Sequence, residues 1–267
     1  MTDQKINISL KETVKSFFKN DDNSYIDNAN QALRFLAKYR SALLANTFKE
    51  EYGTKILSGP FKGMEFLDEV SEGCYLPKLL GIYESEIHNY ISLMVEKKPD
   101  IFINIGSAEG YYSVGLKRLL PDTEVFAFDL NPDAQKKCKI LSEKNSVNVS
   151  IEGEFDVDFI KQFDGKSIFL MCDIEGFESK LFNENNIGLL KDCDICMELH
   201  MYNGMHNIEV MPKLFEQYHD VDIIYQSGKN FSVPEIIYKI SHLDILLSAW
   251  EWISYPSPWL LAHKKSY

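Results

Sequence analysis

The sequence lacks any basic run, and its 28 Lys and Arg are outnumbered by 40 Asp and Glu, which gives a formal net charge of -12. A nucleic-acid groove or a docking face for an anionic membrane needs clustered Lys and Arg, so we expect neither partner. Small molecules and cations suit this charge balance better.

Long apolar runs are missing too. Charged residues interrupt every hydrophobic stretch well short of the ~18 residues that a membrane-spanning helix needs, and residues 1–13 lack the apolar centre of a signal peptide. The five cysteines are an odd number without the spacing of a disulfide framework, which indicates reduced thiols. We therefore expect a cytoplasmic protein without a membrane span.

Two of the cysteines, Cys193 and Cys196, have the CxxC spacing of a redox pair or half a zinc site. The surrounding stretch is typical of a strand, on which residues three apart point to opposite faces. A second CxxC and an HxxxH pattern are both absent from the sequence. We interpret both side chains as buried, unreactive thiols.

The first third of the chain is mainly helical in pattern. Helical periodicity dominates residues 1–50, glycines and a proline at 55–66 indicate a small hairpin, and Ile87 to Val95 follow the spacing of an amphipathic helix. We predict an N-terminal helical cap with a small hairpin over residues 1–83 and a second domain over 84–267. The N-terminal helices are our candidate for a homo-oligomer interface.

From residue 100 onward, short apolar strands alternate with helical segments. The expected strands cover residues 101–105, 125–129, 147–151, 168–173, 194–199, 221–225 and, in the proline-bounded tail, 259–263. This alternation predicts an α/β fold in which helices cover both faces of a parallel sheet.

A loop of small residues follows the first expected strand, where Gly106 and Gly110 allow a sharp turn and close approach of a ligand at a helix start. The second strand ends in Asp129, the place at which nucleotide-binding sheets put an acid that accepts ribose hydroxyls. Together they predict an adenosine-containing cofactor. The candidate cofactor-binding residues are Asn104, Gly106, Ser107, Ala108, Glu109, Gly110, Asp129, Leu130, Glu154 and Asp173.

The loop reads GxxxG with the acid Glu109 inside it, whereas a dinucleotide fold prefers GxGxxG. A carboxylate at that point would repel a pyrophosphate and would suit an ammonium group. S-adenosylmethionine (SAM) carries ammonium and sulfonium charges and no phosphate, so we favour it over NAD.

Residues 105–112, Asp129 and the run Cys-Asp-Ile-Glu-Gly-Phe-Glu at 172–178 resemble the FkbM-type class I SAM-dependent methyltransferases, whose hallmark after the fourth strand is close to D-x-E-G-x-E. The run Met-Glu-Leu-His at 197–200 is similar to the family's acid-x-His ending. The resemblance covers about 84–263 and implies a Rossmann-like, seven-stranded, mostly parallel doubly wound sheet with an antiparallel last strand. One departure is Asn104, where such enzymes commonly have an acid; Glu109 is the candidate to compensate.

Methyl transfer to a hydroxyl needs a general base or a divalent metal that makes the oxygen electron-rich. Asp173 ends the fourth strand, and Glu198 and His200 end the fifth, so all three are expected beside the cofactor. We assign His200 as general base, with Asp173 and Glu198 as catalytic carboxylates that bind Mg2+ or orient the substrate.

Other interpretations of these residues stay open. His200 also fits a solvated loop histidine, Glu198 an ion pair with a lysine, and Glu175 and Glu178 a helix start at which acids meet the helix dipole. At the level of function, the resemblance implies O-methylation of a small polar or sugar-linked acceptor, such as a surface-glycan or secondary-metabolite precursor. The alternatives are an NAD-dependent oxidoreductase and a non-catalytic cofactor-binding scaffold.

Overall fold

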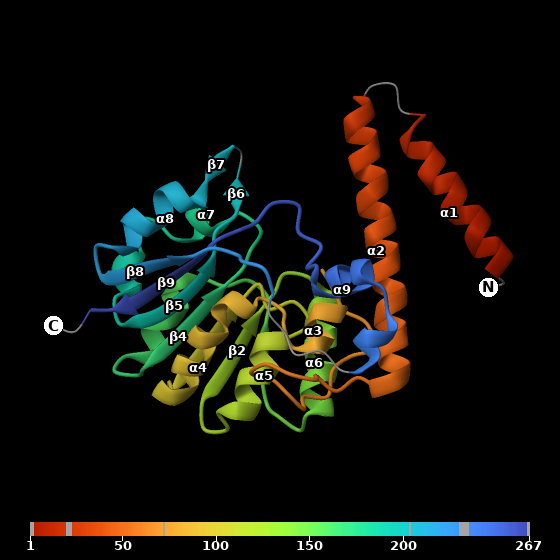
Figure 1. Cartoon of the computed structure of the whole chain (residues 1–267). Helices are drawn as coiled ribbons and strands as arrows, with labels where there is room; N and C mark the ends of the chain where they lie inside the picture. Colours follow the sequence, from red (N-terminus) through yellow and green to blue (C-terminus); the bar gives the residue numbers. More distant parts are fainter. Residues whose placement is uncertain (1–2, 20–22, 72, 203, 230–234, 266–267) are drawn as a thin grey trace.

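Seven strands form one sheet in the computed structural model (Figure 1), which describes all residues except 1–2, 20–22, 72, 203, 230–234 and 266–267. They are β1 (Ile101–Ile105), β2 (Glu124–Phe128), β3 (Ser150–Glu152), β4 (Ile168–Cys172), β5 (Cys193–Glu198), β8 (His219–Ile224) and β9 (Trp259–Lys264). Their order is β3-β2-β1-β4-β5-β9-β8, and β9 runs antiparallel to both of its neighbours. The predicted Rossmann-like α/β fold with an antiparallel last strand is confirmed.

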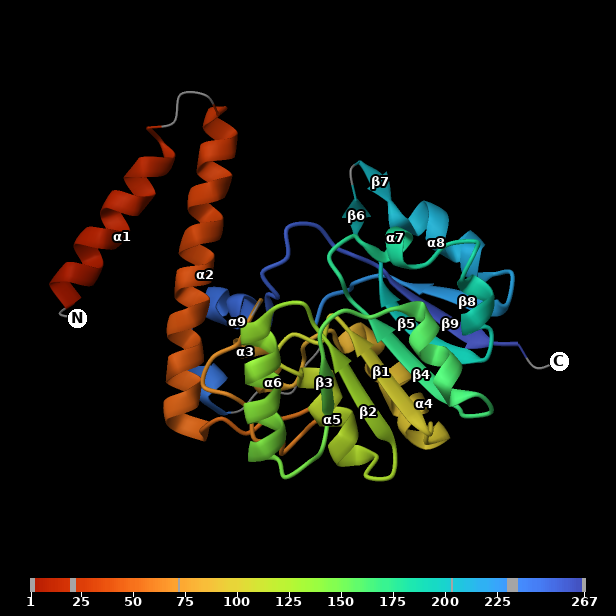
Figure 2. The same ribbon diagram turned by 180° about the vertical axis from the view of Figure 1, so that it is seen from behind.

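Helices connect and cover these strands (Figure 2). They are α1 (Asp3–Phe17), α2 (Tyr25–Tyr52), α3 (Leu76–Leu80), α4 (His88–Lys97), α5 (Tyr111–Leu119), α6 (Pro132–Lys144), α7 (Glu178–Leu181), α8 (Asn207–Phe215) and α9 (His242–Ala249), with 3-10 turns at Ser85–Ile87, Val157–Phe163, Ile187–Leu190 and Glu235–Lys239. A small hairpin, β6 (Met201–Tyr202) with β7 (Met205–His206), stands apart from the main sheet. None of the described helices is long and apolar enough to cross a membrane.

Alternating side chains along the strands build a hydrophobic core on each face of the sheet. Phe102 stacks on Phe169 of the neighbouring strand at 5.0 Å between ring centroids, on the face covered by α4 and α5. Ile103 belongs to the opposite core, which includes residues of α8. Cys196 and Cys193 are divided between the two cores in the same way, so these buried, free thiols lie on opposite faces as predicted.

The strands lie close to their predicted positions, with one clear shift. The strand expected at 147–151 begins at Ser150, because the Val147 amide donates to the Ser142 carbonyl and so closes the end of α6. The second and fourth strands end one residue before Asp129 and Asp173. Both acids therefore stand at the first loop position after a strand.

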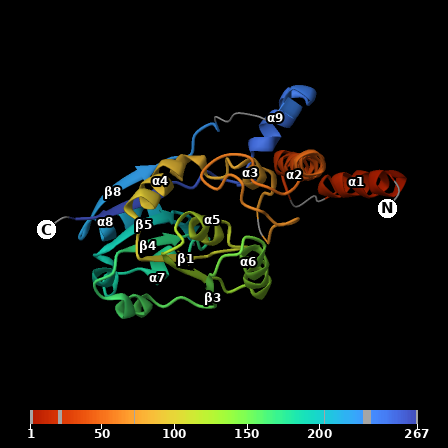
Figure 3. The ribbon, with the colours of Figure 1, turned by 90° about the horizontal axis from the view of Figure 1, so that it is seen from below.

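The N-terminal helices lie at the opposite side of the molecule from the end of β9 (Figure 3). Helix α2 packs against α9, where the Arg40 guanidinium donates to both carboxylate oxygens of Asp244 at 2.7 and 2.8 Å. Phe48 of α2 is fully buried and shares a core with the sheet. The hairpin expected at 55–66 is a loop with one antiparallel bridge, between Lys55 and Glu65.

Candidate active site

Gly106 and Asp173 lie where the carboxyl ends of β1 and β4 meet, which is the point at which the strand order reverses. Gly106 has a φ of 75°, and a Cβ atom there would lie 1.7 Å from the Asp173 carbonyl oxygen. The Asp173 amide in turn donates to the Ile105 carbonyl at 2.9 Å. Only glycine lets the two chain segments approach so closely.

Three consecutive amides of the loop after β1 are already hydrogen-bonded within the protein. Gly106 and Ser107 both donate to the Phe128 carbonyl at 2.9 Å, and Ala108 donates to Asp129 Oδ2 at 2.7 Å. A pyrophosphate needs free N–H groups at such a loop. The arrangement therefore suits a cofactor that places no phosphate there.

Asp129 is half-buried, and its Oδ1 accepts a hydrogen bond from the Asn131 amide at 2.8 Å. Each carboxylate oxygen has two lone pairs, so both oxygens keep capacity for a ligand hydroxyl. Leu130, exposed by 75%, and Glu154, also exposed, lie beyond the ends of β2 and β3. Their contacts with a cofactor stay predictions.

Glu109 has a protein partner of its own. Its side chain is fully buried, Lys78 Nζ lies 2.5 Å from Oε1, and the amide and hydroxyl of Ser71 donate to Oε2 at 3.1 and 2.7 Å. Burial alone would raise the pKa of Glu109, but Lys78 and Ser71 hold it below its usual range. Because Lys78 compensates its charge, Glu109 is engaged within the protein and is not placed to attract an ammonium group or to compensate for Asn104. The occupied amides at 106–108 are what disfavours a pyrophosphate.

Two polar side chains of the loop region are buried. Asn104 donates from Nδ2 to Ser113 Oγ at 2.9 Å, and is thereby engaged with α5. The hydroxyl of Ser107 is buried without a hydrogen-bond partner in the described part of the chain. A buried hydroxyl without a partner is rare, and here it marks a place where a ligand atom would be stabilising.

Three carboxylates converge next to this loop. Glu84, Asp173 and Glu198 each bring an oxygen within 4.8 Å of the other two, and Glu84 and Glu198 are buried. Glu84 stands before the 3-10 turn that leads into α4, with a φ of 49°, and accepts a hydrogen bond from the Tyr112 hydroxyl. Sequence reasoning missed Glu84, because an isolated acid ahead of a helix is also typical of an ordinary helix start.

Burial and mutual repulsion raise the pKa of all three acids. The pKa of Glu84 rises to about 8 and that of Asp173 to about 6, and the pKa of Glu198 rises well above its usual range. Asp173 Oδ1 is buried and has no hydrogen-bond partner among the described residues. A set of oxygen ligands that repel one another in this way fits a hard divalent cation such as Mg2+.

His200 lies beside this cluster, with its side chain only 14% exposed, so it is not a solvated loop residue. Its Nε2 lies 3.6 Å from Glu198 Oε2, 3.7 Å from Glu175 Oε2 and 3.8 Å from Asp173 Oδ1, while Nδ1 lies 3.0 Å from Glu178 Oε1. Burial works against a protonated ring, but the hydrogen bond with Glu178 and the charge of Asp173 raise the pKa of His200. The ring is placed to accept a proton.

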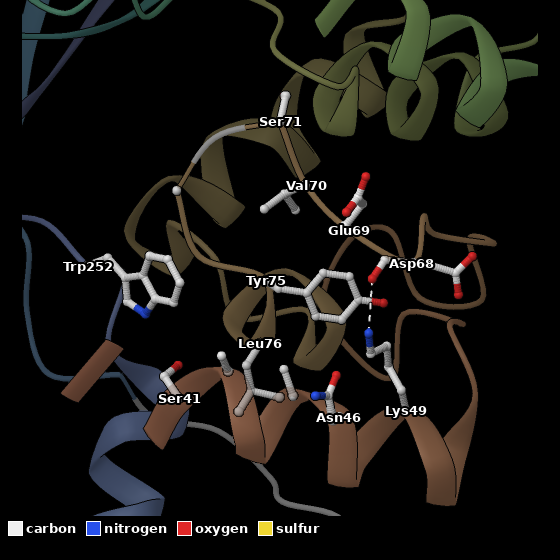
Figure 4. A pocket seen from close by; sticks show the side chains of 13 residues that line it. Ser41, Asn46, Lys49, Asp68, Glu69, Val70, Ser71, Tyr75, Leu76 and Trp252 are labelled. Atoms are coloured by element: carbon white, nitrogen blue, oxygen red, sulfur yellow. Dashed lines mark hydrogen bonds between the residues drawn. The ribbon is translucent and has the colours of Figure 1, made fainter. Parts of the chain in front are cut away.

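An open pocket of about 420 Å³ lies next to this region, between α2 and residues 68–76 (Figure 4). Tyr75 and Trp252 supply its aromatic walls, and Lys49 donates to the Asp68 carbonyl at 3.0 Å. Its lining contains none of the predicted site residues, but it reaches the loop after β1 through Ser71, the partner of Glu109.

No protein-family model matches the chain, and neither does any curated protein. Solved structures with a similar fold include a precorrin-6y C5,15-methyltransferase from Geobacter metallireducens, at 15% identity and a TM-score of 0.43 over 67% of this chain and 89% of that one. A second is an O-methyltransferase of tomaymycin synthesis from Streptomyces achromogenes in complex with SAM, at 14% identity and a TM-score of 0.45 over 66% of this chain and 78% of that one. A third is an O-methyltransferase from Bacillus cereus in complex with S-adenosylhomocysteine (SAH), at 12% identity and a TM-score of 0.44 over 68% of this chain and 81% of that one. At such values these likenesses carry no argument about activity.

Proposed function

We propose that the protein is a SAM-dependent methyltransferase of the FkbM type, which methylates a hydroxyl oxygen of a small polar or sugar-linked acceptor. One observation carries the proposal. Acids gather at one edge of the sheet, beside a loop whose amides at 106–108 are already bonded within the protein. Such an edge favours a ligand with a ribose and positive charges and disfavours one with a pyrophosphate.

The residues of this edge fit the parts of SAM. Asp129 would accept the ribose hydroxyls, and the Ser107 hydroxyl has a hydrogen bond to give. The carboxylates of Asp173 and Glu198 would attract the positively charged end. When bound, SAM supplies an electrophilic methyl group on a sulfonium.

The acceptor oxygen has to be made electron-rich before it attacks. His200 would take the hydroxyl proton on Nε2, the nitrogen that faces the carboxylate cluster. Glu84, Asp173 and Glu198 would hold Mg2+, which would lower the pKa of the acceptor hydroxyl, or would orient the acceptor directly. The cluster supports both versions.

The first test is calorimetric titration of the protein with SAM and, separately, with NAD. Wild type should bind SAM, and Asp129→Ala should weaken that binding by about tenfold or more, as loss of a charge-assisted hydrogen bond predicts. Asp122→Ala, at an exposed acid after α5, is the matched control. Binding of NAD with no response to SAM would indicate an oxidoreductase and refute the proposal.

The second test separates an enzyme from a scaffold. Release of S-adenosylhomocysteine is measured with a panel of methyl glycosides and simple alcohols as acceptors. Turnover should fall by about a hundredfold or more in His200→Ala, since a positioned base typically contributes that much. SAM binding without turnover of any acceptor, unchanged by His200→Ala or Asp173→Ala, would support the scaffold instead.

A further inference from the structure

Glu178, the first residue of α7, is a buried carboxylate with both oxygens occupied. Its exposure is 0%, Oε1 accepts the Gly176 amide at 3.1 Å and lies 3.0 Å from His200 Nδ1, and Oε2 accepts a hydrogen bond from the Asn207 side-chain amide. The helix-start role expected from the sequence accounts for the contact with Gly176 alone. The contacts with His200 and Asn207 come from tertiary structure.

This geometry decides which nitrogen of His200 carries the proton. Oε1 of Glu178 accepts a hydrogen bond from the Gly176 amide and Oε2 accepts one from the Asn207 side chain, so both oxygens act as acceptors in this geometry. Nδ1 is therefore the donor, and the lone pair of the neutral ring is on Nε2. Nε2 faces Asp173 and Glu198 at 3.8 and 3.6 Å, distances at which no direct hydrogen bond forms.

Asn207 fixes this arrangement from the other side. After His200 the chain forms the hairpin of β6 and β7 and comes back to the site at Asn207. The backbone N–H of Asn207 donates to the His200 carbonyl at 3.1 Å. Asn207 is fully buried, and its side chain also donates to the Gly176 carbonyl at 3.3 Å. The end of β5, the start of α7 and the start of α8 are thus held together around one ring.

We propose that Glu178 is a positioning residue that holds His200 in the Nδ1–H tautomer with Nε2 directed at the acceptor, and that Asn207 orients Glu178. This inference rests on the proposed function. In the reaction, the acceptor proton passes to Nε2 as the oxygen bonds to the methyl carbon, and the electron pair of the broken carbon–sulfur bond stays on sulfur. Glu178 stabilises the imidazolium that results.

The test reads the tautomer directly. Protein labelled with 15N-histidine is studied by long-range 1H–15N correlation on the neutral ring, and His200→Asn assigns the signal. Wild type should show Nδ1–H. In Glu178→Leu the ratio of Nδ1–H to Nε2–H should fall by about tenfold or more, as expected for one charge-assisted hydrogen bond.

Two further variants separate position from charge. Glu175→Gln removes an exposed carboxylate on the Nε2 side and should keep Nδ1–H. The double variant Glu178→Gln with Asn207→Asp moves the negative charge from position 178 to position 207. The glutamine oxygen can still accept the hydrogen bond from Nδ1–H, so this variant should show the wild-type signal that Glu178→Leu loses. A purely structural role for Glu178 would leave the tautomer ratio unchanged in Glu178→Leu.

A wild-type ring protonated on Nε2 would overturn the proposal, and this result needs no variant to fold. Retention of Nδ1–H in folded Glu178→Leu would overturn it as well. The spectra are recorded without cofactor, so the outcome is independent of SAM binding. Nδ1–H in a protein that binds no SAM would refute the proposed function and leave the positioning role intact.

Discussion

The ion pair between Lys78 and Glu109 offers a test of how the loop after β1, residues 106–110, is held. Lys78 lies in α3, in the N-terminal part of the chain, and its side chain is 5% exposed; that of Glu109 is 0% exposed. Burial alone would lower the pKa of Lys78, but Glu109 raises it above its usual value. Each charge therefore depends on the other, and Glu109→Gln removes one while leaving an oxygen for the hydrogen bonds from Ser71.

The expected cost follows from the burial of the pair. Removing one partner of a buried ion pair leaves an uncompensated charge and costs about 3–5 kcal/mol. Glu109→Gln and Lys78→Met should each lower the free energy of unfolding by that amount. The double variant has no charge at either of these two positions, so its loss of stability should be smaller than the sum of the two single losses, with a coupling of about 2 kcal/mol or more.

Urea unfolding of the four proteins, under reducing conditions, measures this cycle. The same cycle on Lys161 and Asp158, an exposed pair with a comparable 2.7 Å separation, is the control and should show no resolvable coupling. Additive losses at Lys78 and Glu109 would refute the reasoning. So would a Glu109→Gln variant that keeps wild-type stability but binds SAM more weakly, since that result would make Glu109 a ligand of the cofactor.

Three other outcomes test separate parts of the structure. Gly106→Ala should lower the free energy of unfolding by about 3 kcal/mol or more in urea titrations, because its Cβ would lie 1.7 Å from the Asp173 carbonyl oxygen. Arg40 holds the pKa of Asp244 at about 2, below its ordinary 3.8, and solvent partly screens the half-exposed guanidinium. Arg40→Gln should therefore lower the free energy of unfolding by about 1 kcal/mol above pH 4 and by progressively less toward pH 2. Urea titrations across that pH range measure the difference. Glu84→Gln should weaken Mg2+ binding by about tenfold in calorimetry, and turnover that survives EDTA would favour base catalysis without a metal.

The edge of the sheet was predictable from sequence because parallel strands impose a simple geometry. Short apolar runs at residues 101–105, 168–173 and 194–199 predict parallel strands, and a parallel sheet brings the carboxyl ends of its strands to one side. That was enough to place Asp173, Glu198 and His200 near one another. The third strand was misplaced because Val147 is apolar but closes the last turn of α6, a use of an apolar residue that strand patterns do not distinguish.

The contacts that decide the chemistry of these residues were not predictable, because their partners are distant in sequence. Glu109 lies in a glycine loop, a pattern typical of a ligand-binding carboxylate. Its buried ion pair depends on Lys78, which lies 31 residues earlier in the sequence. Glu178 has the pattern of a helix start, and its contact with His200 forms because β5, the next strand along the chain, ends beside α7.

The residues on either side of the predicted boundary after residue 83 show what the N-terminal part contributes. Lys78 neutralises Glu109 in the loop after β1, and Glu84 supplies a carboxylate to the cluster of Glu84, Asp173 and Glu198. Between them, Tyr83 lies with its ring 4.8 Å from Lys78 Nζ. The resemblance to methyltransferases begins at about residue 84, yet groups from both sides of that point set the charge of the site. The segment that contains Lys78 therefore helps to hold the loop after β1, and its loss would leave Glu109 as an uncompensated charge in the core.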